Sequence, residues 1–65
     1  MRIDIKKLEI IQARNCMTAK DIEKKADISH ATYLRIKRGS DKTAPLTVGK
    51  IAKALNCEVV ELLAD

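Results

Sequence analysis

Two short helical segments near the middle of the chain are separated by only three residues, and this spacing constrains the fold more than any other feature of the sequence. Thr18, with an acid three positions later, is typical of a helix N-cap and predicts a helix over residues 18–26. Ser29 is likewise expected to cap a helix over residues 30–38, and Gly39 is expected to end it because glycine tolerates positive φ. A turn this short makes the first helix present the second one at the surface.

The rest of the chain also shows helical periodicity. Ile5, Leu8 and Ile11 fall on one face at helical spacing, which predicts a helix from about Asp4 to Asn15. After a loop from Ser40 to Pro45, two more helices are expected: one capped by Thr47, running through Leu55 and closed by Asn56, and one from Glu58 to Ala64.

These patterns predict an all-α fold of five short helices in one domain over residues 1–65. The two glycines and one proline leave little turn chemistry for β-hairpins. Tyr33 is expected to fill the core with its hydroxyl reaching the edge, and Cys16 and Cys57 are expected to pack. The other residues expected in the core are apolar: Ile5, Leu8, Ile11, Met17, Ile22, Ile28, Ile36, Val48, Ile51, Leu55, Leu62 and Leu63.

Size and composition exclude several classes of function. A core of this size has little interior for a catalytic pocket, and no constellation of catalytic side chains is present, so an enzyme is not expected. A single aromatic residue argues against stacking on single-stranded nucleic acid. Two distant cysteines and His30 are too few ligands for zinc, and no metal or other cofactor is expected. Charges among the first six residues argue against a signal peptide, and no apolar run is long enough for a membrane span. A cytoplasmic protein with reduced thiols is therefore expected.

The net charge of +4 is unevenly distributed. Residues 14–53 contain ten Lys and Arg residues and four acids, a net charge of +6. The two ends together contain three bases and five acids, a net charge of −2. A positive middle segment is suited to a polyanion, although a solvated charged surface alone would give the same count.

Two stretches of the chain resemble a known family. Residues 17–39, MTAKDIEKKADISHATYLRIKRG, and residues 51–63, IAKALNCEVVELL, are similar to the lambda repressor/Cro-like (XRE family) helix-turn-helix. The similarity covers about residues 5–63. It implies a five-helix domain that binds double-stranded DNA, reads the major groove with the helix over residues 30–38, and acts as a homodimer on a palindromic operator.

Several positions depart from the pattern of that family. Ala19 stands where the family often has Gln, Glu23 where it has a small residue, and Asp27 where it has Gly. Gln12 and Lys37 stand where the family frequently pairs an Arg with a Glu. Both partners differ together, so Lys37 is expected to be free to face phosphate.

The resemblance places His30, Ala31 and Arg35 at positions that face base edges. Arg35 is expected to bind guanine O6 and N7 through its planar fork, and Ala31 has only a methyl group for thymine. The alternatives are an Arg35 side chain on phosphate or in solvent, an unpartnered His30, and mere clearance at Ala31. Cap positions and the loop after residue 38 suggest phosphate contacts, or else solvated side chains, at Thr18, Lys20, Ser29, Thr32, Lys37, Arg38, Lys42 and Thr43.

The function expected from these residues is a sequence-specific transcriptional regulator, repressor-like in type, that needs no small-molecule ligand. Pro45, Leu46 and Val60 are candidates for a dimer face. The alternative is an antitoxin-like or accessory module that uses the same fold to bind another protein. Exposed apolar side chains such as Leu34 and Val60 would suit that role.

Overall fold

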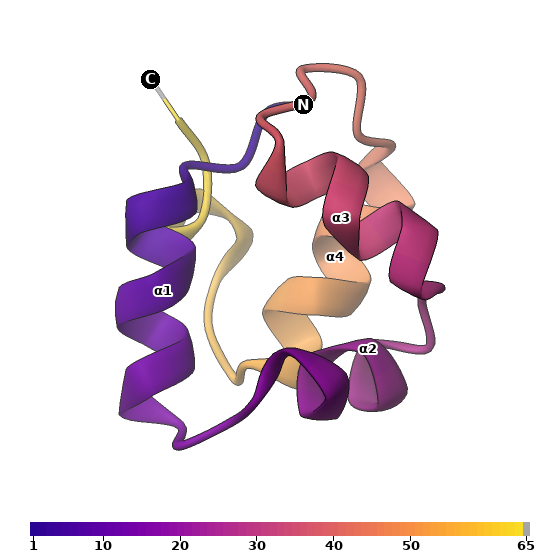
Figure 1. Ribbon diagram of the computed structural model, residues 1–65. Coiled ribbons are helices and arrows are strands. Elements are labelled where there is room, and N and C mark those ends of the chain that lie inside the picture. Colours follow the sequence, from indigo (N-terminus) through magenta and orange to yellow (C-terminus); the bar gives the residue numbers. More distant parts are fainter. Residues whose placement is uncertain (65) are drawn as a thin grey trace.

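The computed structural model describes residues 1–64, and Asp65 lies outside the described part. It confirms the all-α class (Figure 1). Its elements are α1 (Ile5–Arg14), α2 (Ala19–Ala26), α3 (His30–Lys37), α4 (Pro45–Ala54) and a 3-10 turn, η1 (Val59–Glu61).

Side-chain caps begin the first three helices. The Asp4 carboxylate accepts a hydrogen bond from the backbone N–H of Lys7 at 3.1 Å, which starts α1. Thr18 and Asp21 form a reciprocal capping box at the start of α2, and Ser29 caps α3. Each cap satisfies a helix N–H that has no partner within the helix. The predicted starts of α2 and α3 are thereby confirmed.

Within residues 1–64, four residues adopt positive φ where helices end or turns close. Gly39 has φ of 87°, and Asn56, which was predicted to close the fourth helix, has φ of 54°. Asp27 and Cys16 have φ of 57° and 54°. Positive φ strains residues that carry a Cβ, and this explains why the related family has Gly at the position of Asp27.

Two predicted helices differ from the structure. The fourth helix begins at Pro45 rather than after Thr47, because proline is favoured in the first turn of a helix, where its missing N–H is no loss. The expected fifth helix over residues 58–64 is only the 3-10 turn Val59–Glu61. Its remaining residues pair instead with the N-terminal segment: Leu62 O accepts from Asp4 N at 2.8 Å, and an antiparallel bridge joins Ile3 to Leu63.

All four helices contribute buried residues to the core, and α4 contributes the most. Ile3, absent from the predicted core, is 2% exposed because of its bridge to Leu63. Cys16 is exposed rather than packed, and Cys57 is half-buried. The other predicted core residues are buried or packed against the core as partly buried side chains.

The Tyr33 ring is buried as predicted, but its hydroxyl does not reach the edge. The Tyr33 Oη atom is buried and has no hydrogen-bond partner among the described residues. Burial raises the pKa of Tyr33, and the carboxylates of Glu23 and Glu9 raise this pKa further. A neutral phenol is therefore enclosed beneath α3.

Candidate nucleic-acid interface

The outer face of α3 is a continuous exposed stripe. His30, Ala31, Leu34, Arg35 and Arg38 are exposed. They lie at intervals of three, four or one residues, which places them on one side of the helix. Tyr33 and Ile36 on the opposite side are in the core. The three residues predicted to face bases thus share one exposed surface. The core-facing side chains on the other side of the helix hold it in place.

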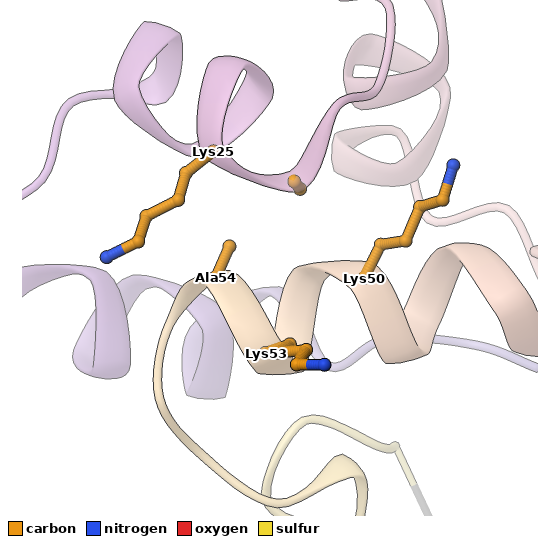
Figure 2. A pocket seen from close by; sticks show the side chains of 5 residues that line it. Lys25, Lys50, Lys53 and Ala54 are labelled. Atoms are coloured by element: carbon orange, nitrogen blue, oxygen red, sulfur yellow. The ribbon is translucent and has the colours of Figure 1, made fainter.

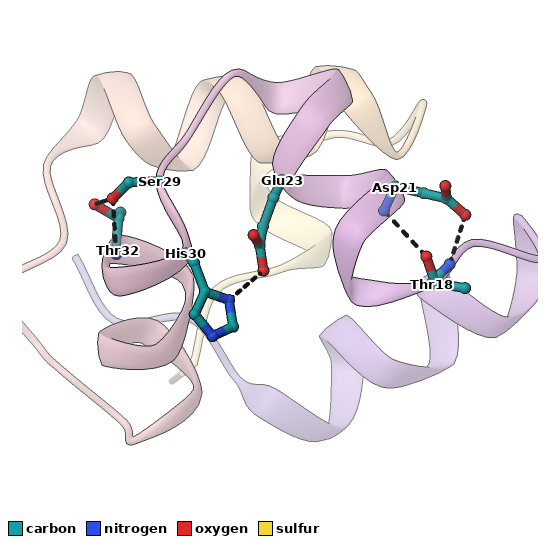
Figure 3. A network of polar contacts seen from close by, with 6 residues as sticks. All are labelled: Thr18, Asp21, Glu23, Ser29, His30 and Thr32. Atoms are coloured by element: carbon teal, nitrogen blue, oxygen red, sulfur yellow. Dashed lines mark hydrogen bonds and ion pairs between the residues drawn. The ribbon is translucent and has the colours of Figure 1, made fainter.

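Figure 3 shows the caps of α2 and α3 together with His30, the first residue of this stripe. The Thr18 hydroxyl oxygen accepts from Asp21 N at 3.1 Å, and the Ser29 hydroxyl oxygen accepts from Thr32 N at 3.1 Å. The Ser29 hydroxyl donates to the Thr32 hydroxyl at 2.9 Å. The hydrogens of the Thr18 and Thr32 hydroxyls are not used in these bonds. They remain available to a phosphate oxygen, which can only accept.

The other member of the capping box, Asp21, is an exposed carboxylate. Its oxygen accepts from Thr18 N at 2.9 Å, and this backbone hydrogen bond is the main reason that the pKa of Asp21 is lowered. This carboxylate therefore keeps its charge to lower pH than an isolated aspartate would. Lys20, also exposed in the first turn of α2, provides positive charge next to this acid.

A second contact joins α2 to α3. Glu23 Oε2 lies 3.0 Å from His30 Nδ1 (Figure 3). The Glu23 side chain is 14% exposed and that of His30 is 70% exposed. The departure of Glu23 from the family pattern was noted from the sequence, but no partner for it was predicted. An acid one helical turn from the end of α2, with a histidine seven residues later across the turn, is a signal that could have revealed the pair.

The two phosphate contacts predicted in the loop after α3 differ in their exposure. Lys42 is exposed, and its backbone N–H donates to the Ser40 hydroxyl at 3.2 Å. Thr43 is only 5% exposed, and its hydroxyl is buried without a partner. Its backbone N–H and carbonyl both bond to Met1. Thr43 therefore has no free polar group at the surface, which corrects its assignment as a phosphate contact.

Lys37 requires a second correction, because it is not free. Its ammonium lies 3.2 Å from Glu9 Oε2, and its side chain is 29% exposed. Gln12, the other departure from the family pair, donates to the Met17 carbonyl at 3.0 Å. Each of the two positions has thus gained a different partner.

The family of the chain follows from a direct comparison. A family model described as helix-turn-helix matches residues 10–62. The chain belongs to the lambda repressor/Cro-like helix-turn-helix family. This family consists of DNA-binding regulatory domains and is not a family of enzymes, and its members bind double-stranded DNA. Comparison with curated proteins and with solved structures gave no match.

The helix-turn-helix domain also exposes apolar side chains away from the stripe on α3. The dimer candidates Leu46 and Val60 are 71% and 73% exposed, and Pro45 is exposed as well. Ile10 on α1, which was not predicted, is 57% exposed. No helix within residues 1–64 has the length and apolar character needed to span a bilayer.

A shallow hollow between α2 and α4 of the domain carries positive charge. Its volume is about 210 Å³, and it is lined by Lys25, Ala26, Lys50, Lys53 and Ala54. The three lysines extend in different directions, so their ammonium groups do not converge on one point (Figure 2). No group of three potential metal-ligating side chains occurs within residues 1–64.

Proposed function

We propose that the protein is a sequence-specific transcriptional regulator, repressor-like in type, that reads the major groove of an operator in the cytoplasm. The exposed stripe on α3 is the observation that supports this function best. Arg35 stands in the middle of the stripe, and the buried Tyr33 and Ile36 fix the helix from behind. A helix anchored in this way can enter a groove about 12 Å wide without rearrangement.

Base readout is assigned to three side chains of the stripe. Arg35 binds guanine O6 and N7 with its two-pronged guanidinium, the strongest single source of specificity here. Ala31 approaches a thymine methyl group, and His30 binds a base edge from the first turn of the helix. Leu34 lies between these residues, is 39% exposed and packs against the sugar backbone.

Phosphate contacts surround this reading surface. They position the duplex and make binding dependent on salt, but carry no sequence information. Lys37 and Thr43 are not in the proposed set, because one is paired with Glu9 and the other is buried. Ser29 is not in the set as a direct contact either, because its hydroxyl donates to that of Thr32. The set consists of Thr18, Lys20, Thr32, Arg38 and Lys42.

A single helix of eight residues reads few base pairs, so we propose that two copies bind together on a palindromic operator. Pro45, Leu46 and Val60 are the proposed dimer face, because Leu46 and Val60 are the most exposed large apolar side chains described. The second candidate function, an antitoxin-like or accessory protein-interaction module, is favoured by the same apolar exposure and by that of Ile10. Neither role requires a small-molecule ligand or a cofactor.

Selection from random duplexes tests the proposal. We expect a palindrome whose half-sites lie about 10 base pairs apart, centre to centre. The variant with Arg35, Arg38 and Lys42 all changed to Ala should lose binding to the selected duplex at moderate salt. The matched control changes Lys24, Lys25 and Lys53, exposed lysines outside the proposed interface, to Ala.

The two triple variants remove the same charge, so a difference between them reflects position rather than net charge. Equal binding by the first variant and the wild type would overturn the proposal. A selection that yields no operator, together with a stoichiometric protein partner in a pull-down, would favour the protein-interaction module.

A further inference from the structure

The contact between Glu23 and His30 links the helix that supports the reading surface to the helix that forms it. Glu23 lies on α2 and is 14% exposed, whereas His30 is in the first turn of α3 and 70% exposed. Glu23 Oε2 and His30 Nδ1 are 3.0 Å apart. The carboxylate and the imidazole thus point toward one another across the turn between α2 and α3 (Figure 3).

This geometry determines which nitrogen carries the proton in a neutral imidazole. An ionised carboxylate is only an acceptor, so His30 Nδ1 must be the donor. In a neutral ring the other nitrogen, Nε2, then has a free lone pair. Figure 3 shows Nδ1 directed at Glu23 and Nε2 on the opposite side of the ring. Within residues 1–64, Glu23 is the only hydrogen-bond partner of the ring.

We propose that Glu23 is a positioning residue for base recognition, which orients His30 so that Nε2 faces the major groove as a hydrogen-bond acceptor. This inference depends on the proposed function. An acceptor requires a donor on the base edge, and the donors there are the amino groups of cytosine N4 and adenine N6. His30 therefore favours a base whose own edge bears an amino group, adenine or cytosine, at its position and discriminates against guanine and thymine, whose edges there offer only acceptors.

A purely structural brace between α2 and α3 would form the same hydrogen bond and would also place the proton on Nδ1. Its loss would weaken the fold without altering base preference. The preferred base is therefore the measurement that separates the alternatives, and the position of the proton tests the hydrogen bond on which both depend.

The first experiment measures the proton position in the free protein. His30 is the only histidine, so long-range ¹H–¹⁵N correlation spectra at pH 8 report on this ring alone. We expect the proton on Nδ1 in the wild type and in Glu23→Gln, whose amide oxygen can still accept it. In Glu23→Ala we expect it to move to Nε2. A wild-type ring with the proton on Nε2, or with protons on both nitrogens, would overturn the proposal.

The second experiment repeats the selection from random duplexes with Glu23→Ala, Glu23→Gln and His30→Ala. We expect Glu23→Ala and His30→Ala to lower the preference for an amino-bearing base at the same operator position by about fivefold, the effect of one hydrogen bond. The preference at the Arg35 position should be unchanged. Glu23→Gln should retain the wild-type preference, since it retains the acceptor.

Circular dichroism of each variant establishes that it is folded before selection. An unchanged base preference in Glu23→Ala would overturn the proposal even if the variant binds more tightly. If no variant and no wild type selects an operator, the proposed function fails, and the spectra still report separately on the orientation of His30.

Discussion

The ammonium of Lys37 lies 3.2 Å from the carboxylate of Glu9 and joins the last turn of α3 to α1. Glu9 is 61% exposed, so this is a surface ion pair. Such a pair contributes only about 0–1 kcal/mol to stability. Its larger effect is on the available charge, because Lys37 is neutralised by an acid of its own chain.

Lys37→Met is therefore expected to leave the salt dependence of DNA binding nearly unchanged. The free energy of unfolding should fall by less than about 1 kcal/mol, the range of exposed ion pairs. Binding isotherms at several salt concentrations and urea denaturation measure the two quantities. Glu9→Gln is the matched control for stability. A drop in salt slope as large as that of an exposed lysine would mean that Lys37 leaves Glu9 and contacts phosphate.

Arg35→Ala and Lys42→Ala should have different effects. Loss of Arg35 removes a base contact, so one operator position should lose its preference for guanine, with a cost of about 1–3 kcal/mol for the best duplex. Loss of Lys42 should weaken binding to all sequences alike and reduce the slope of log K against log salt concentration by about 1. Titrations against the operator and a scrambled duplex distinguish the two. A uniform effect of Arg35→Ala would place this side chain on the backbone.

Thr43→Val is expected to leave DNA affinity unchanged and to stabilise the fold. The hydroxyl of Thr43 is buried and unpartnered, and its replacement by a methyl group of similar size removes a desolvation cost of about 1 kcal/mol. Thermal unfolding measures the gain. Loss of DNA affinity in this variant, with its fold intact, would show that Thr43 does take part in the interface.

Tyr33→Phe should raise stability by about 1 kcal/mol at neutral pH, because it removes the buried, unpartnered hydroxyl. The pH dependence should differ too. The folded-state pKa of Tyr33 is raised above the ordinary 10.0, mainly by burial. Above pH 10 the unfolded chain therefore binds fewer protons than the folded one, and the free energy of unfolding falls as pH rises.

The advantage of Tyr33→Phe over the wild type should accordingly widen above pH 10. Urea denaturation at pH 7 and at several values between pH 9 and 11 tests this. Ultraviolet absorbance follows the phenol directly, since Tyr33 is the only tyrosine. A phenol that titrates at its ordinary pKa in the folded protein would contradict its burial.

The local parts of the fold could be predicted from the sequence. A cap such as Thr18 or Ser29 and a chain reversal such as Gly39 or Asn56 act on their own neighbours, so a short window of residues contains the relevant information. The expected last helix was wrong for the opposite reason. Residues 62–64 pair with the other end of the chain through the Ile3–Leu63 bridge, a contact that local propensity cannot reveal.

The candidate site likewise has features that depend on neighbouring residues and features that depend on contacts between distant segments. Helical periodicity alone is enough to place Arg35 on an exposed face, and the structure has it there. The partners of Lys37 and Glu23 and the burial of Thr43 arise from packing between segments, which the pattern of one sequence does not encode. The charge of a side chain indicates which groups it can contact. Only the folded structure shows whether another residue of the same chain already pairs with it.

The capping hydroxyls of Thr18 and Ser29 have a consequence for any mutational map of the domain. In the proposed interface the hydroxyl that begins α2 also lies against a phosphate, and the hydroxyl of Ser29 that begins α3 holds the Thr32 hydroxyl beside another. An alanine at either position would lower thermal stability and DNA affinity together. The lost cap alone would lower the free energy of unfolding by about 1 kcal/mol. Selection for tighter binding therefore cannot change these two residues independently of the fold. Adaptation to a new operator is left to the exposed stripe of α3, where side chains can vary without such a penalty.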